Sequence, residues 1–553
     1  MGFFSLLTAL SPLIATFPTE VSGPMLYSLH HGDVERAFKG YIEQAKEEHT
    51  HDFALLQQAA KALLEQGAAS KDPEIQLLCM FGAGVASSAD LLPILEKGIH
   101  SDEPRTQLIA LSYLGRQQDD EADLVLLEAL SSPFLITRLE ALALLAKKNH
   151  PAVLSHLYSL TVKVPSLARS VFAQIAVQLE GIEAERFLHK LLNDEEILVR
   201  TETLLAIAKE KRDDFLPYVR ILARGASHMQ QEAVAVAFGA LKDQHSLERL
   251  KEFVSSKQDT VKLAAALSLY VLGERKYIEL IEAEAKNGSL FAIAALGKLE
   301  EGKETLFTLL SHQERDVRLN ATLALLNQRD TRILSFLNEL LIEDGRDIGF
   351  WRITSGGGGL KAWKTISSAS QQEKNYPGLK EETLSLREQV LTQCIEFEDE
   401  TFLKVAQLIM EKRQHALIPL LVELLENKKN EAAVRFLKEG QRMAGAPLIR
   451  NYCTLSLYRL NEEGPYEDEL IAWVKARGGE QLIRFREEDK PASTFNSLHE
   501  LTPEETSRFL IEAFEALASA QNQAGIDILV HTIAYGNPKN RYALAGLLLR
   551  TTE

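Results

Sequence analysis

Apolar residues recur with the spacing of an α-helix along most of the chain. Between residues 74 and 345 the same two-helix pattern restarts at intervals of about 30 residues, most clearly at Arg315–Leu326 followed by Ile333–Leu341. In each half the apolar positions fall three or four residues apart, which places them on one helix face. A two-helix unit repeated at a fixed interval predicts a helical solenoid, because each unit buries its apolar face only when it stacks on its neighbours.

A basic residue near the start of each first helix marks the register of the repeat. The basic register positions are Arg105, Arg138, Arg169, Arg200, Lys262 and Arg318. Three and six residues later the chain carries mostly apolar or small side chains, which lie on one face of the first helix. We expect this face to form the contact between successive repeats, where alanine lets the helix backbones approach closely.

The run from Asp316 to Leu325, followed by a turn and a leucine-rich helix, resembles a HEAT repeat of the short bacterial variety also found in phycobilisome-lyase proteins. The resemblance extends from Lys71 to about Gly345, and the whole chain also resembles a HEAT-repeat family of Chlamydia-like bacteria. It implies an all-α fold, an α-α superhelix with helical caps at both ends. Such arrays serve as scaffolds for protein or peptide partners, and a few are enzymes.

Breaks in the periodicity predict four parts. These are an N-terminal helical cap with a hairpin similar to a tetratricopeptide repeat (1–68), a HEAT-like array (69–345), a Gly-rich irregular insertion or hinge (346–380), and C-terminal helical repeats with a cap (381–553). In the last part Thr502, Pro503 and Glu505 form a capping box at the start of a helix. The helices that follow it are expected to close the end of the solenoid.

The insertion is marked by four consecutive glycines, Gly356–Gly359, with Trp351 and Trp363 on either side. Each glycine costs about 1 kcal/mol relative to alanine inside a helix, so the segment should not be helical. The two tryptophans are either aromatic anchors of a loop that closes on a partner or side chains that pack on the adjoining helices of a plain linker.

The net charge and the apolar segments of the chain exclude some classes of function. The chain carries 78 acidic and 61 basic residues, a net charge of −17, which argues against a general nucleic-acid binder. The uncharged apolar segment Gly2–Phe17 is either the core of a signal peptide or a buried capping segment, and no other stretch is long and apolar enough to span a membrane. We therefore predict a cytoplasmic protein, or an exported one if this segment acts as a signal.

The residues that commonly carry chemistry do not form a recognisable site. The three cysteines lie in apolar helical contexts typical of small buried side chains, and no G-x-S-x-G, H-E-x-x-H or C-x-x-C motif is present. We predict no catalytic residue, no metal and no cofactor. The alternative is a lyase-like or metal-dependent enzyme on the same scaffold, with His30, His31, His49 and His51 as its best candidate residues; otherwise these histidines cap helix ends.

The resemblance to HEAT arrays implies that the second helices line the concave side. Those helices carry the candidate binding residues Lys190, Arg220, Arg224, Arg249 and Lys251. Acidic residues follow along the array, so the charge change could orient a polar partner, although solvated helix faces would look the same. We predict a non-catalytic scaffold or adaptor that binds a protein or peptide along this groove. The substitutions Arg220→Glu and Arg249→Glu should then weaken binding of the partner and leave the thermal unfolding of the helices unchanged.

Overall fold

The computed structural model describes residues 19–48, 50–117, 120–342, 346–352, 360–367, 378–484 and 501–552. The segment Gly2–Phe17, His49, the glycines Gly356–Gly359 and the side chain of Trp351 lie outside this description. The described residues form an all-α HEAT- or armadillo-like repeat fold, as predicted, with one small β-hairpin. They divide into two compact units: the first combines Met1–Ala141 with Asn461–Glu553, and the second is Leu142–Leu460. This division differs from the four predicted parts.

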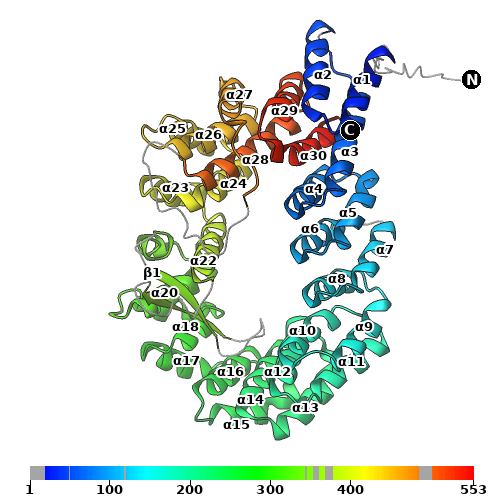
Figure 1. Ribbon diagram of the computed structural model, residues 1–553. Helices are drawn as coiled ribbons and strands as arrows, with labels where there is room; N and C mark the ends of the chain where they lie inside the picture. The colour runs from blue at the N-terminus through cyan, green and yellow to red at the C-terminus, as the bar shows by residue number, and fades with distance from the viewer. Residues whose placement is uncertain are drawn as a thin grey trace, which may run out of the picture. The chain divides into compact units, whose positions relative to one another are not determined.

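The second unit is a row of antiparallel helix pairs (Figure 1). The helices, with α8 (Leu135–Lys147) at the unit boundary, are α9 (Ala152–Thr161), α10 (Ser166–Ala176), α11 (Ile182–Leu192), α12 (Ile197–Lys209), α13 (Leu216–Gly225), α14 (His228–Ala240), α15 (Leu247–Val254), α16 (Asp259–Val271), α17 (Tyr277–Lys286), α18 (Leu290–Leu296), α19 (Lys303–Leu309), α20 (Arg315–Asn327), α21 (Asn338–Leu341), α22 (Leu379–Cys394), α23 (Asp399–Glu411), α24 (Ile418–Lys428), α25 (Glu431–Gln441) and α26 (Pro447–Arg459).

The first helices of successive pairs form the concave side of this unit. Helix α10 packs directly on α12, α12 on α14 and α14 on α16, whereas the second helices α11, α13 and α15 contact one another little. In a curved row the elements at the smaller radius lie closest together, and Figure 1 shows the first helices on the inner side of the arc. The prediction that the second helices line the concave side is therefore wrong.

Hydrogen bonds from the fourth residue of the first helix link several consecutive repeats, although the fourth residue of α18 is the apolar Ile293. Gln107 donates from Nε2 to the carbonyl of Ser101 over 2.7 Å, and its Oε1 accepts from the Ser132 hydroxyl 25 residues later. Arg169 repeats the arrangement in the second unit, donating to the carbonyl of Val164 and pairing with Asp194 at 3.0 Å. The predicted register residue Arg169 is therefore structural, because it satisfies the turn between repeats. In α6 (Pro104–Leu114) the fourth residue is Gln107, so the predicted register residue Arg105 lies two positions too early.

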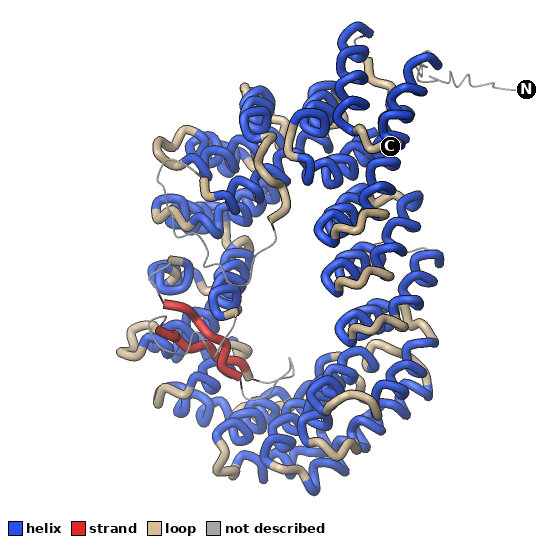
Figure 2. Tube along the Cα trace, viewed as in Figure 1, coloured by secondary structure: helices blue, strands red, loops and turns tan. Residues whose placement is uncertain are grey.

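Residues 346–367, expected to be irregular, include an antiparallel β-hairpin (Figure 2). Strand β1 (Arg346–Arg352) pairs with β2 (Lys361–Ser367), with Ile348 opposite Thr365. Unpaired strand edges need partners for their N–H and C=O groups, and side chains of the neighbouring helices supply them. On the β1 edge, the N–H of Ile348 donates to the hydroxyl of Thr383 on α22 over 2.8 Å.

The β2 edge is held by α20. The side-chain amide of Asn320 accepts from the N–H of Trp363 at 2.9 Å and donates to the Trp363 carbonyl at 2.7 Å. One turn earlier, a carboxylate oxygen of Asp316 accepts from the N–H of Thr365 at 2.8 Å. Two helix side chains thus replace a third strand, and β2 lies extended along α20.

The first unit joins the two ends of the chain. Its helices are α1 (Thr19–His30), α2 (Val34–Glu48), α3 (Phe53–Ala68), α4 (Pro73–Ala86), α5 (Leu92–Ile99), α6 (Pro104–Leu114), α7 (Asp120–Ala129), α27 (Tyr466–Arg477), α28 (Pro503–Ser519), α29 (Gln523–Tyr535) and α30 (Arg541–Thr552). Helix α30 packs on α3 and α4, and α29 packs on α2. The C-terminal helices therefore pack on the N-terminal helices, and do not simply close the end of a stack.

Glycines allow α30 to approach α4 at backbone distance. A Cβ built on Gly82 would lie 2.1 Å from the carbonyl oxygen of Tyr542, and one on Gly546 would lie 2.0 Å from the carbonyl oxygen of Gly82. No side chain fits at either position without moving a helix backbone. An ion pair of 2.5 Å between Lys539 and Glu74 lies beside this contact.

Several local predictions are confirmed. Thr502 accepts from the N–H of Glu505, and the Glu505 carboxylate accepts from the N–H of Thr502, which completes the capping box of α28. Cys79, Cys394 and Cys453 are buried free thiols, and burial raises the pKa of each to about 12. Among the described helices, none has the length and apolarity that a bilayer crossing requires.

Candidate functional site

Apolar side chains line the concave side of the second unit at a regular interval. The second residues of α10, α12, α14, α16 and α18 follow one another at intervals of 31 residues, and all except Thr260 are apolar: Leu167, Leu198, Met229, Thr260 and Phe291. Leu167 is 72% exposed and Met229 47% exposed, while the other three are half-buried. Isolated exposed apolar residues are ordinary, but a row repeated on adjacent helices is typical of a surface that meets a partner.

Helix geometry explains why this row is exposed. Positions one and two turns along a helix share a face, so on α10 Leu167 and Val171 point the same way and are both exposed. The opposite face of α10, with Phe172 and Ala173, is fully buried between repeats. The concave face therefore remains outside the core of the repeat.

On α20 the same face is occupied. Its second and sixth residues are Asp316 and Asn320, the two residues that hold β2. The corresponding positions on α10 are Leu167 and Val171. An extended segment of this chain thus lies on a face of α20 that is bare on α10.

A cavity of about 640 Å³ lies next to the hairpin on the same face. Residues from α18, the loop after it, α20, β2 and α22 line it, and the polar ones include Lys298, Asn327, Lys361, Glu382, Gln389 and Gln393. Volumes of this size accommodate a small ligand or a short peptide segment.

Lys298 is a cation of this cavity for which the described residues provide no partner. Its side chain is accessible to solvent, and it makes no hydrogen bond or ion pair with any residue in the described ranges. The protein that surrounds it lowers the pKa of its ammonium group by desolvation, and the positive charge of Lys361 lowers that pKa further.

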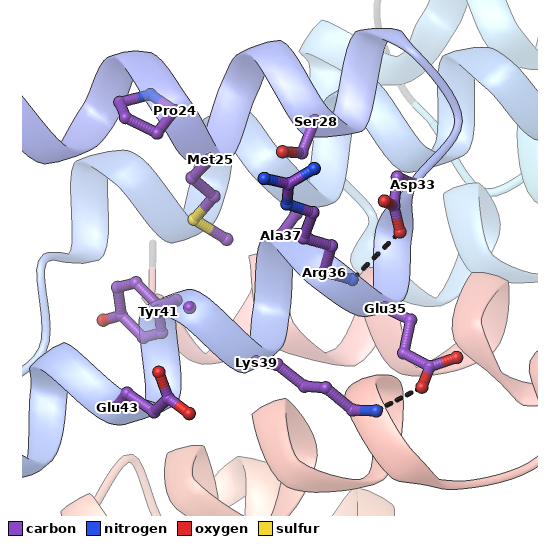
Figure 3. A pocket seen from close by; sticks show the side chains of 11 residues that line it. Pro24, Met25, Ser28, Asp33, Glu35, Arg36, Ala37, Lys39, Tyr41 and Glu43 are labelled. Carbon is purple, nitrogen blue, oxygen red and sulfur yellow. Dashed lines mark hydrogen bonds and ion pairs between the residues drawn. The ribbon is translucent and has the colours of Figure 1, made fainter.

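A second cavity, of about 560 Å³, lies between α1 and α2 in the first unit (Figure 3). Asp33 accepts from the backbone N–H of Arg36, and Lys39 pairs with Glu35 one turn away. These contacts are local to α2, so the residues that line this cavity show no set of groups converging on a ligand.

The five cations predicted to line the groove lie on the outer row of second helices. Lys190 lies over the ring of Tyr158 at 5.2 Å, and Arg224 is exposed. Lys251 pairs with Glu248 at 2.7 Å. Their predicted placement on the concave side is wrong, and that they bind a partner stays a prediction.

Arg220 and Arg249 bind residues of their own and adjacent repeats. The guanidinium of Arg220 makes two hydrogen bonds, of 2.9 and 2.6 Å, to the carboxylate of Asp243, which is 1% exposed. Arg249 donates to the carbonyl of Ala223 over 3.1 Å and pairs with Glu252. Both side chains therefore act in packing between repeats.

The predicted histidine site is not assembled in the described residues. His30 and His31 are exposed, and the ring of His31 bonds the carbonyl of Tyr27. His51 is buried, 3.0 Å from the Tyr41 hydroxyl and 3.2 Å from the carboxylate of Asp527, so it links the N-terminal helices to α29.

A different group brings three potential metal ligands together in the first unit. Glu96, His100 and Glu128 lie within ligand distance of one another, and His100 bonds Glu128 at 2.9 Å. His100 and Glu128 are exposed, and such surface groups are common without a metal. Their positions on separate helices, 28 residues apart, leave no motif that sequence reasoning could detect.

Of the two predicted loop anchors, only Trp363 is described. Its side chain is half-buried and lines the 640 Å³ cavity, while its backbone binds Asn320. This position agrees more closely with packing on the adjoining helices than with a free anchor.

No family model and no curated protein matches the chain. Among known structures, a chain described as a homology model of the full-length AP-3 complex in an intermediate open conformation is similar at 13% sequence identity and a TM-score of 0.24, over 93% of this chain and 98% of that chain. A likeness at this score carries no argument about function.

Proposed function

We propose that this protein is a non-catalytic scaffold that binds an extended segment of a partner protein along the concave face of its first helices. The observation that carries the proposal is the row that starts at Leu167 and repeats every 31 residues, in which four of five side chains are apolar and Leu167 and Met229 are exposed. Apolar anchors at a fixed interval favour a partner that presents apolar side chains along its own length.

The seating of β2 on α20 supports an extended conformation for that partner. Asp316 and Asn320 form these hydrogen bonds with the backbone of β2 and not with its side chains. A helix face of this kind therefore binds the free edge of a strand whatever side chains the strand carries. A partner strand would reach Leu167 and Val171 at the corresponding positions of α10. Side chains from one face of the strand would then meet the apolar row, as they do in other strand-binding surfaces.

Charge and the absence of recognised chemistry complete the proposal. The net charge of −17 favours a protein partner over a nucleic acid, and a cytoplasmic location is consistent with three free thiols. The finer resemblance to phycobilisome-lyase repeats would add an enzymatic role. The described group of potential metal ligands, Glu96, His100 and Glu128, is largely exposed and contains none of the histidines predicted for such a role. We therefore retain the scaffold as the single proposed function.

The test uses peptides selected from a random display library on the full-length protein. For peptides so obtained, Leu167→Glu and Met229→Glu should each weaken binding at least tenfold, about 1.4 kcal/mol, because a charge replaces an apolar anchor. Both side chains are exposed, so the fold should survive. Affinity is measured by fluorescence polarisation.

The matched control is Ile221→Glu, the same kind of change at a residue 61% exposed on the outer helix α13. It should leave affinity within twofold of the parent protein. Equal losses from the inner and outer variants, or a library that enriches no peptide, would remove the proposed function.

A further inference from the structure

We infer that the cavity bounded by α18, α20, β2 and α22 binds a carboxylate side chain of the partner segment. The inference rests on the proposed function and assigns the chemistry of one subsite on the same concave face. The ligand class is an aspartate or glutamate within an extended peptide.

The first support is the path of β2. The backbone N–H of Thr365 donates to Asp316 near the start of α20, and that of Trp363 donates to Asn320 one turn later. Strand β2 therefore runs antiparallel to α20, and Lys361, two residues before Trp363, reaches the cavity lined by Asn327 at the end of that helix. The cavity thus lies at the end of the stretch of α20 that β2 occupies, and Ala294 in its wall belongs to α18, the helix that carries Phe291 of the apolar row. A peptide that follows the row as far as α18 would reach the cavity.

The second support is charge. Lys298 and Lys361 are two basic side chains that both line the cavity. Lys298 makes no ion pair or hydrogen bond within the described ranges. The nearby positive charge of Lys361 disfavours the protonated form of Lys298. Two like charges held in one concavity destabilise each other, and a carboxylate bound at Lys298 would offset that cost.

The third support is the set of hydrogen-bond donors around the two lysines. Asn327, Gln389 and Gln393 present side-chain amides to the cavity. Amide N–H groups and ammonium groups are the donors that a carboxylate accepts from. Glu382 also lines the cavity, so the cavity holds one carboxylate of its own beside the two lysines.

A peptide is favoured over a free anion because of the cavity's surroundings. Leu323, Leu386 and Val390 line it together with the polar groups, so the stem and backbone of a peptide residue would find apolar contacts there. An inorganic anion offers no such surface.

The experiment repeats the peptide selection with Lys298→Glu. The parent protein should enrich peptides with an aspartate or glutamate at one fixed spacing from the apolar positions. Lys298→Glu should select lysine or arginine there, and it should bind the parent's peptides at least tenfold more weakly. Lys286→Glu, the same charge change at an exposed residue of the outer helix α17, should keep the acidic preference.

Two further measurements keep the outcomes distinct. Lys298→Gln removes the charge without adding one and should lose the acidic preference while the circular-dichroism melt stays unchanged, which separates binding from folding. Acetylation of Lys298 by acetic anhydride, followed by mass spectrometry, should slow when the selected peptide is bound and should not slow with inorganic phosphate at the same concentration.

The results that would overturn the inference differ from those that would overturn the proposed function. The carboxylate subsite alone is contradicted if the selected peptides share apolar positions but no acidic one. It is also contradicted if Lys298→Glu selects peptides with the same acidic position as the parent protein. Protection of Lys298 by phosphate would assign the cavity to a free anion instead. A library that yields no consensus removes both.

Discussion

Replacing Gly82 by leucine is expected to lower the stability of the first unit by about 3 kcal/mol, the upper range for inserting a side chain into a closely packed contact. The reason is geometric, since a Cβ at Gly82 would lie 2.1 Å from the backbone oxygen of Tyr542. The side chain can be accommodated only if α30 moves away from α4. Urea unfolding followed by circular dichroism should show an earlier transition, and limited proteolysis should cut the C-terminal helices sooner.

Gly40 provides the matched control. It lies within α2, and a Cβ there would meet nothing within 4 Å. Gly40→Ala should therefore be neutral or stabilise by about 0.5–1 kcal/mol through helix propensity. If Gly82→Leu unfolds at the same urea concentration as the parent protein, the backbone contact between α4 and α30 does not hold the chain ends together.

Replacing Arg220 by glutamate should destabilise the second unit by roughly 2–4 kcal/mol, because it leaves the buried carboxylate of Asp243 beside a second negative charge. This expectation replaces the prediction of an unchanged melt made from the sequence. Arg224→Glu is the control: it makes the same charge change one turn later, at an exposed residue, and should shift stability by less than about 0.5 kcal/mol.

The Arg220 effect should depend on pH with a definite sign. Burial alone raises the pKa of Asp243, but hydrogen bonds from Arg220, Ser246 and the N–H of His245 outweigh burial, and the net pKa is lowered. A carboxyl group with a lowered pKa stabilises the fold above its unfolded value of about 3.9, and this contribution is lost as pH falls through the folded value. The difference in thermal midpoint between the parent and Arg220→Glu should therefore be large at pH 7 and shrink below about pH 4. An equal difference at both pH values would contradict the assigned role of the pair.

The local features of the fold could be read from the sequence because they depend on neighbouring residues. The repeat around Asp316 and Arg318 and the capping box at Thr502 are short-range patterns of periodicity and hydrogen bonding, and both are present. The hairpin was missed although β1 and β2 are rich in aromatic and β-branched residues, which is the usual signal for strands. The run of glycines between the two strands indicates a break in regular structure, so the sequence does not reveal that the strands pair.

The long-range features could not be read in the same way. The contact between Gly82 and Gly546 joins helices at opposite ends of the chain, and nothing in either segment identifies the other. Which helix of each pair faces inward depends on how closely successive repeats pack, which the apolar positions alone do not reveal. Once α12 and α14 are seen to form the concave row, the interval of 31 residues from Leu198 to Met229 identifies the site.

The candidate cations show why charge patterns are weak guides to binding. Arg220 looks in the sequence like an exposed base on a helix face, but its partner Asp243 lies in the next repeat and is buried. A sequence contains both residues without showing that they meet. Lys298 follows a short helix and belongs to no recognisable pattern, so the sequence does not single it out. Only the folded chain brings it to the same cavity as Lys361.

The measurement that tests the concave binding face most directly is site-specific photo-crosslinking of a selected peptide. A benzophenone amino acid is placed at Met229 on the inner helix α14 or, in a separate protein, at Ile221 on the outer helix α13. The proposed scaffold predicts a crosslink to the peptide from position 229 and none from position 221. A crosslink from position 221 alone would show that the partner binds the outer helices and would contradict the account.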